Sequence, residues 1–445
     1  MRKFIQTIQN IWKIEDLRSR LLTTLLFVLI YRFGSFVVLP GIDPTALTAL
    51  QAQTAGGLMA LLDMFSGGAF SNASIFALGI MPYISASIVI QLLTIAVPYF
   101  QKMQKEGESG RQKMNQITRY LTVAILLFQG PSYLVNLSVQ MAQAGQSVAV
   151  GFNWFTISST ILLCAGSMFV MWLGERITDR GIGNGISFII LIGIIARFPQ
   201  AIIQEFGSRL NEGGGLMVFI LEIILLLAVF AFAILLVQGT RRIPVQYAKR
   251  MVGNKQYGGV RQYIPLKVNA ANVMPIIFAQ AIMFIPIALA GFSSSEANAF
   301  TRAFMDNNGF WYNAVFALLI IVFTYFYTAI IINPVQMAEN LKLNNGFIPG
   351  VKPGKKTAEY IDSIMTRLTL PGSCLLAIIA VLPAFARLFG VSMGFAQFFG
   401  GTSLLIMVGV ILDTLQQIES KLLERHYDGF YESGIRIKGR SAMAY

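Results

Sequence analysis

Charged residues are scarce in this chain. Of its 445 residues, 12% are charged and 55% are hydrophobic, whereas soluble domains carry about 25% charged residues. Histidine occurs once, as His426 in a polar tail where we expect it to be solvated, and cysteine occurs twice, as Cys164 and Cys374. Neither cysteine has a partner at a disulfide or metal-binding spacing. The composition excludes a soluble globular domain and predicts no disulfide framework and no metal site.

Long hydrophobic runs are what the chain has instead. A membrane-crossing helix needs about 20 mainly apolar residues, and ten windows meet this requirement. These windows lie at 21–40, 73–97, 117–140, 154–173, 184–204, 216–238, 268–290, 312–333, 368–387 and 398–415. Membrane β-strands are shorter and alternate polar with apolar residues. The runs therefore predict an all-α polytopic membrane protein with ten transmembrane helices.

Basic residues gather on one side of this expected topology. Ten spans put both termini on the same side, and the segments there hold 29 of the 34 lysines and arginines. Cytoplasmic loops collect Lys and Arg, so we expect both termini in the cytoplasm. Residues 1–20 carry apolar side chains at helical spacing, which indicates an amphipathic helix on the cytoplasmic surface, with a disordered basic tail as the alternative. No cleavable signal peptide is expected.

The spans divide into two halves of five. The first half covers residues 21–207 and the second covers 208–418, followed by a cytoplasmic tail at 419–445. Because each half holds an odd number of spans, the second enters the membrane from the opposite face. This topology predicts two inverted, pseudo-symmetric halves with the working site at their interface near the bilayer midplane.

Ionisable residues are nearly missing from the middle of the spans. Arg32, Arg197, Glu222 and Asp413 lie toward span ends, where snorkelling explains them. Coupled transporters usually need charge at depth, so a ten-span secondary transporter is the disfavoured alternative.

An enzyme is not expected, because no nucleophile stands with a base. The glycines of RGIGNGIS (180–187) lack the Lys-Ser/Thr ending of a phosphate loop, and we interpret them as a tight turn that starts a helix.

Two cytoplasmic loops are long and basic, at 239–267 and 333–367. In the first, valines and tyrosines flank Gly-Asn and Gly-Gly pairs, which favours a β-hairpin-like projection. In the second, FIPGVKPG is expected to form an exposed tip. Ordinary solvated loops are the simpler interpretation, but their length and turn residues favour docking of an acidic partner, either ribosomal RNA or a cytosolic protein.

Long motifs run through the chain from the first span to the last. Among them are RFGSFVVLPGID (32–43), MFSGGAFSNASIFALGIMPYISASIVIQLL (64–93), KEGESGRQK (105–113), MWLGERITDRGIGNGIS (171–187), RRIPVQYAKR (241–250), PLKVNAANVMPIIFA (265–279), NPVQMAENLK (333–342), PGVKPGKKTAEYID (349–362), MTRLTL (365–370) and GGTSLLI (400–406). In these motifs the sequence resembles the SecY family, the central subunits of bacterial protein-conducting channels.

The resemblance implies an hourglass pore closed by a plug. Residues 57–71, a short apolar segment broken by Gly67 and Gly68, would form the plug, with Met64, Phe65, Ser66, Gly67, Gly68, Ala69 and Phe70 at its centre. Glycines and small polar residues make such a segment weakly helical and mobile. The family's constriction ring would consist of Ile80, Ile84, Ile186, Ile190, Ile277 and Ile406. From composition alone, these isoleucines would be assigned to core or lipid-facing positions.

The resemblance also implies a lateral gate and a docking surface. The gate would open between spans 2 and 3 on one side and 7 and 8 on the other, with Pro82, Gln91, Gln129, Asn269, Asn272, Pro275 and Gln280 on or beside it. Ordinary packing polar residues are the alternative for each of these side chains. The ribosome and the motor ATPase SecA would contact Arg241, Arg242, Lys249, Arg250 and Lys352. The family usually has arginine where Lys352 stands, and lysine keeps the charge but loses bidentate geometry.

The function implied is a passive channel in the bacterial inner membrane. It would move unfolded secretory polypeptides across the membrane and release apolar segments sideways into the lipid bilayer. The chain itself would use no cofactor and hydrolyse nothing. Its expected partners are SecE and SecG, SecA, the ribosome and signal-sequence-bearing polypeptides, with SecD and SecF as further candidates. A thylakoid homologue is the alternative location.

Overall fold

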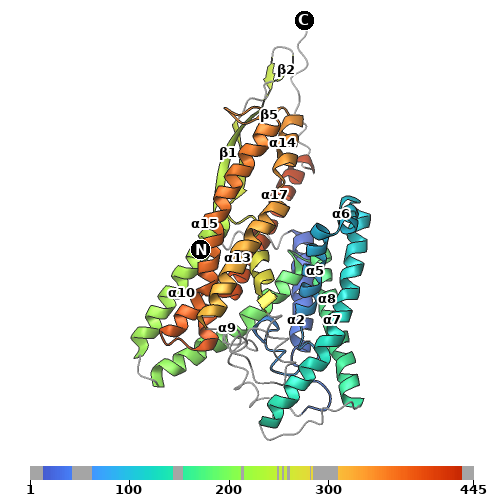
Figure 1. Ribbon diagram of the computed structural model, residues 1–445, viewed down its shortest axis with the longest axis vertical. Coiled ribbons are helices and arrows are strands. Elements are labelled where there is room, and N and C mark those ends of the chain that lie inside the picture. Colours follow the sequence, from blue (N-terminus) through green and yellow to red (C-terminus); the bar gives the residue numbers. More distant parts are fainter. Residues whose placement is uncertain are drawn as a thin grey trace.

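The computed structural model describes residues 14–42, 63–143, 154–211, 215–247, 250–252, 255–257, 261–280, 282–283 and 309–432. Helices dominate this part of the chain, and they form two lobes that meet at one end of the molecule (Figure 1). The first half contains α2 (Glu15–Gly34), α5 (Met81–Ala96), α6 (Pro98–Lys105), α7 (Glu108–Gln143), α8 (Trp154–Arg180) and α9 (Gly185–Asn211). The second half contains α10 (Gly215–Gln238), α13 (Phe310–Ile331), α14 (Pro334–Leu343), α15 (Lys355–Leu388), α16 (Met393–Ala396) and α17 (Gly401–Glu432).

The membrane spans predicted from the sequence correspond to these helices. Within the described residues, seven helices are long and apolar enough to cross a membrane, and an eighth span results if α5 and α6, bent by 101°, are counted as one. The first predicted span corresponds to α2. The seventh is described only in part: residues 274–280 are helical, and residues 284–290 lie outside the described part.

The second predicted span begins later than the sequence indicates. The window starts at residue 73, but regular helix begins at Met81, and the preceding residues from Ser66 form successive turns. Inside the window, Ala73 and Gly79 have positive φ angles of 44° and 55°, which a right-handed helix does not accept. Apolar composition therefore mislocated the start of this helix.

The turn predicted at residues 180–187 is confirmed. Gly183 has φ 81°, and the Asn184 side chain accepts a hydrogen bond of 3.1 Å from the backbone N–H of Ile186. An asparagine in this position caps the first turn of the following helix, α9.

Helix α9 connects the two halves. It packs against α8 and α2 of its own half and against α10, α16 and α17 of the other. One hydrophobic cluster therefore continues through both halves, with buried residues from α2, α8, α9, α16 and α17 among its members. A second cluster lies within the second half, around α10, α13, α15 and α17.

The two long basic loops form one folded protrusion at the end of the molecule away from the meeting point of the lobes (Figure 1). The predicted hairpin is confirmed: β1 (Thr240–Tyr247) pairs antiparallel with β4 (Arg261–Lys267), and β2 (Arg250–Val252) pairs with β3 (Lys255–Tyr257) between them. The sequence did not indicate that β5 (Gly346–Phe347), from the second loop, would pair with β1. A small apolar core that includes Ile243, Leu341 and Ile361 joins both loops.

Some expectations fall on residues outside the described part of the chain. These are residues 1–13 of the N-terminal amphipathic helix, residues 57–62 of the plug, Lys249, and residues 433–445 of the tail. They stay predictions.

Candidate functional site: a plugged isoleucine constriction

The six isoleucines predicted to line the pore come together in one hydrophobic cluster. Their elements differ: Ile80 and Ile84 belong to the start of α5, Ile186 and Ile190 to α9, Ile277 to the seventh span and Ile406 to α17. Ile80, Ile190 and Ile406 are 3%, 2% and 1% exposed, and the other three are partly buried against the same cluster. Spacing alone could not have brought four distant segments together. The structure thus brings the six predicted ring residues together in one apolar cluster that both halves contribute to.

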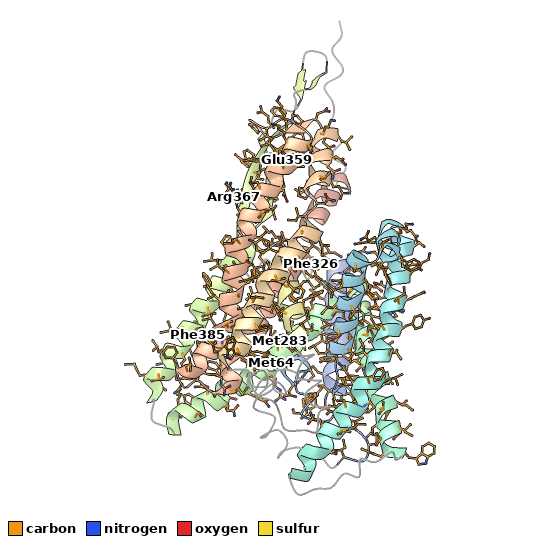
Figure 2. All side chains as sticks on the ribbon, in the orientation of Figure 1. Met64, Met283, Phe326, Glu359, Arg367 and Phe385 are labelled. Atoms are coloured by element: carbon orange, nitrogen blue, oxygen red, sulfur yellow. The ribbon has the colours of Figure 1, made fainter. Side chains whose placement is uncertain are left out.

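The plug occupies the same cluster. Met64, Phe65 and Ala69 are buried members of it, and Phe70 packs in an adjoining cluster with Tyr133. Figure 2 shows Met64 low in the molecule, between the two lobes. Every residue from Asp63 to Ser71 is buried. The described part of the plug is therefore fully enclosed by protein.

Polar side chains from two helices, α2 and α7, hold the plug backbone. Tyr31 Oη of α2 donates a hydrogen bond of 3.1 Å to the carbonyl of Ser66, and Arg32 Nη1 donates one of 2.7 Å to the carbonyl of Gly67. Tyr133 Oη of α7 donates one of 2.8 Å to the carbonyl of Phe70. Because a buried carbonyl without a partner is costly, these donors allow an irregular segment to stay inside the protein.

An ion pair fixes the start of the plug to α9. Arg197 pairs with Asp63 Oδ2 and donates a hydrogen bond of 2.8 Å to Ser71 Oγ, while Asp63 Oδ1 accepts one of 2.8 Å from the backbone N–H of Ser71. Snorkelling is therefore the wrong explanation for Arg32 and Arg197, since both guanidinium groups bind the plug. Charged residues are rare within the spans, and this rarity marks the two arginines as unusual. The sequence does not identify their partners, because these are distant in the chain.

A second buried ion-pair network joins the halves near the link between them. Arg209 of α9 bonds Glu205 at 3.0 Å, pairs with Glu222 of α10 at 2.5 Å, and donates a 2.9 Å hydrogen bond to the carbonyl of Gly390. Glu205 also accepts a 2.9 Å bond from the N–H of Ser392. Glu222 is 8% exposed, so snorkelling is wrong for this residue as well.

In the described part of the chain, the predicted gate contains one direct polar contact between the halves. Tyr327 Oη of α13 donates a hydrogen bond to Gln91 Oε1 of α5. Around it, Ile88 of α5 packs with Ala271, Phe278 and Tyr327. The structure thus places α5 against both the seventh span and α13, where the gate was expected. Tyr327 was missed because a tyrosine in an apolar span carries no distinctive pattern.

The other predicted gate residues do not reach across it in the described structure. The Asn269 Nδ2 atom donates a hydrogen bond of 3.0 Å to the carbonyl of Asn272, and Asn272 Nδ2 lies 3.4 Å from Asp413 of α17. Asp413 therefore has a partner within its own half. Gln280 lines a pocket of about 80 Å³ inside the second half. Of the remaining predicted residues, Gln129 is half-buried on α7, and Pro82 and Pro275 are buried.

The predicted docking residues lie on the protrusion. Arg241 and Arg242 are exposed on β1, and β2 begins at Arg250. Lys352 is exposed at the tip of the second loop, and its carbonyl accepts a 2.9 Å hydrogen bond from Thr357 Oγ1. This bond fixes the tip to the start of α15.

Comparisons with known proteins agree on one family. The SecY family model matches residues 74–415. Relatives named protein translocase subunit SecY include those of Streptomyces scabiei, 44% identical over 432 residues covering 94% of this chain and 98% of the relative, and of Halalkalibacterium halodurans, 44% identical with 96% and 99% covered. The Thermotoga maritima relative is 41% identical, with 98% and 99% covered.

Solved structures show the same fold. "The structure of a protein conducting channel" aligns with a TM-score of 0.61 at 16% identity, covering 91% of this chain and 92% of that one. A structure described as the SecY plug domain stabilising the closed channel gives 0.59 with the same identity and coverage, and Sec61 in the canine ribosome–channel complex gives 0.58 at 15% identity, covering 91% and 92%. The expected fold, a mostly helical membrane channel, is confirmed, and the seven or eight spans among the described residues are consistent with the predicted ten. This chain belongs to the SecY family of protein-conducting channel subunits.

Proposed function

We propose that unfolded polypeptides cross this channel through the ring of six isoleucines after the plug has moved away. The observation that carries the proposal is that plug and ring residues share one buried cluster at the junction of the halves. An apolar constriction resists wetting and therefore passes ions and water poorly at rest. It also offers no fixed hydrogen-bonding partner, so chains of any sequence can pass.

The contact between α5 on one side and the seventh span and α13 on the other is the proposed exit into lipid. Apart from the Gln91–Tyr327 hydrogen bond, the contacts described here between these elements are apolar or aromatic. Polar bonds between membrane helices contribute about 1 kcal/mol each. A signal sequence or apolar segment, which supplies a similar apolar surface, can therefore replace these contacts at low cost.

Energy for transport comes from partners in this proposal. The chain acts as the channel and hydrolyses nothing, while SecA or the translating ribosome docks on the protrusion that presents Arg241, Arg242 and Lys352. Support comes from the exposure of these residues on a folded sheet and from the solved relative described as a ribosome–channel complex. SecE and SecG complete the complex, with SecD and SecF as accessory partners.

The proposed location is the bacterial inner membrane, with both termini in the cytoplasm. The distribution of basic residues supports this orientation, because the protrusion and both termini would lie on the same, positively charged side. Residues 1–20 would lie as an amphipathic helix on that surface.

Site-specific photo-crosslinking tests the proposal. A photoreactive residue is placed at Ile84, Ile190 or Ile406 in the reconstituted complex, and a secretory precursor is arrested during export. We expect crosslinks from all three positions that depend on a functional signal sequence. Leu225 of α10, which is 51% exposed toward the lipid side, is the matched control and should give none. A precursor that crosslinks to Leu225 and to no ring position would overturn the proposed path.

A further inference from the structure

Two arginines from different helices bind the plug. Arg32 reaches it from α2 and Arg197 from α9, and their bonding partners in the plug are the carbonyl of Gly67, the carboxylate of Asp63 and the hydroxyl of Ser71. A Cβ atom added at Gly67 would lie 2.9 Å from Arg32 Nη1, and one added at Gly68 would lie 3.0 Å from Arg197 Nη2. Since neighbouring Cα atoms are about 3.8 Å apart and each Cβ lies about 1.5 Å from its Cα, these two guanidinium nitrogens lie within about 13 Å of each other.

Departure of the plug removes Asp63, which among the described residues is the only carboxylate that pairs with either arginine. Among the described residues, Arg197 has one ion-pair partner, Asp63, and Arg32 has none. Outside the plug, Arg197 bonds the Gln200 side chain at 3.3 Å, and Arg32 lies 5.2 Å from the ring centre of Phe36. Neither of these contacts neutralises charge. The site therefore changes from two cations and one anion to two cations.

We propose that Arg32 and Arg197 form a charge-selective site for the translocating polypeptide, covered by the plug at rest and uncovered when it moves. The site rests on the proposed function, since it requires the plug to leave and a chain to pass in its place. Acidic side chains of the passing segment take over the bonds that Asp63 and the Gly67 carbonyl made. Basic segments meet two unpaired positive charges and pass more slowly. The ring determines where the chain passes, and the arginines determine which charge passes readily.

Arginine suits this role on chemical grounds. Its guanidinium binds carboxylates and carbonyl oxygens through several donors, so it can hold successive groups of a moving chain. The expected preference for an acidic over an uncharged segment is roughly fivefold, the factor given by one pair of opposite unit charges about 4 Å apart in water, and the discrimination against a basic segment is of about the same size. Because the site is open to solvent once uncovered, added salt should reduce the preference.

The test compares three precursors that share a signal sequence and differ in one short segment, which is acidic, uncharged or basic. Export into vesicles carrying the reconstituted complex is measured without a membrane potential, because a potential acts on substrate charge by itself. The R32Q/R197Q double variant should bring the acidic-to-basic rate ratio close to one. The R32K/R197K variant perturbs the same plug contacts but keeps both charges, and it should retain the ratio. Arg176→Gln, on α8 beside Trp172, is the matched control and should behave as wild type.

The following outcomes distinguish failure of this inference from failure of the proposed function. If R32Q/R197Q exports the uncharged precursor and keeps the wild-type ratio, the charge-selective site is wrong while the channel function stands. If R32K/R197K loses the ratio together with R32Q/R197Q, the arginines act only by holding the plug, which also overturns the inference. A wild-type complex that exports no precursor at all would instead contradict the proposed function.

Discussion

At the scale of the residue, a few positions in the plug are determined by crowding. Gly67 has φ 65°, and a Cβ atom there would lie 2.8 Å from the Cα of Gly193 and 2.9 Å from Arg32 Nη1. The sequence indicated a glycine pair in a mobile segment. It could not indicate that Arg32 and Gly193 both lie against Gly67, because both are far away in the chain.

Gly67→Ala should loosen the plug and let ions leak through the resting channel. Gly107→Ala is the matched control, because Gly107 has a similar φ of 73° but no atom within 4 Å of an added Cβ. Both changes cost about 1–2 kcal/mol of backbone strain. Only Gly67→Ala adds a steric clash. Ion conductance of the purified complex in planar bilayers measures the effect. Equal conductance for the two variants would show that crowding at Gly67 does not hold the plug.

At the scale of the element, the protrusion is more integrated than two separate loops. The β-hairpin was predictable because its valines, tyrosines and turn glycines are local signals. The pairing of β5 with β1 was not, because two residues of strand carry too little pattern. The same limit applies to the start of α5. The apolar segment just before this helix predicts helix from its composition, although residues with positive φ interrupt it.

Lys352→Glu should impair SecA-driven export more than Lys102→Glu. Both lysines are exposed, so a general change of surface charge affects them alike, but only Lys352 stands on a tip fixed by the Thr357 hydrogen bond. Export rate of one precursor, measured at several SecA concentrations, should show a weaker apparent affinity for SecA in the first variant. Identical curves for both variants would exclude a specialised role for the tip.

At the scale of the whole molecule, the contacts between the two halves include the predicted isoleucine ring with its plug, the Arg209 network, the hydrogen bond from the Gly183 N–H to the Gln417 side chain, and the contact of α5 with the seventh span and α13. The count of spans and their division into halves followed from hydrophobic runs and charge placement, which are properties of the whole chain. The polar contacts between halves did not follow, because each joins residues separated by long stretches of sequence. The ring itself was found through family resemblance, since an isoleucine in a span has no distinguishing chemistry.

Crosslinking the halves at the gate should block export. Gln91→Cys and Tyr327→Cys, in a background with Cys164→Ser and Cys374→Ser, place two thiols at the observed hydrogen bond. A flexible bis-maleimide should stop export of a precursor by joining α5 to α13. The control pair, Gly130→Cys and Thr160→Cys, joins α7 and α8 within one half, where a Cβ at residue 130 would lie 3.0 Å from Thr160. Undiminished export by the fully crosslinked gate pair would refute lateral separation at this contact.

The Arg209 network has a consequence for how the halves separate. Its two carboxylates are buried and bonded to Arg209, which is partly exposed, so pulling them apart would leave buried carboxylates unpaired, at a cost of several kcal/mol. The gate, by contrast, loses one hydrogen bond and some apolar contact. Widening of the channel is therefore expected to swing one half about the corner that holds Glu205 and Glu222, with displacement growing with distance from that pivot, rather than to slide the halves past each other.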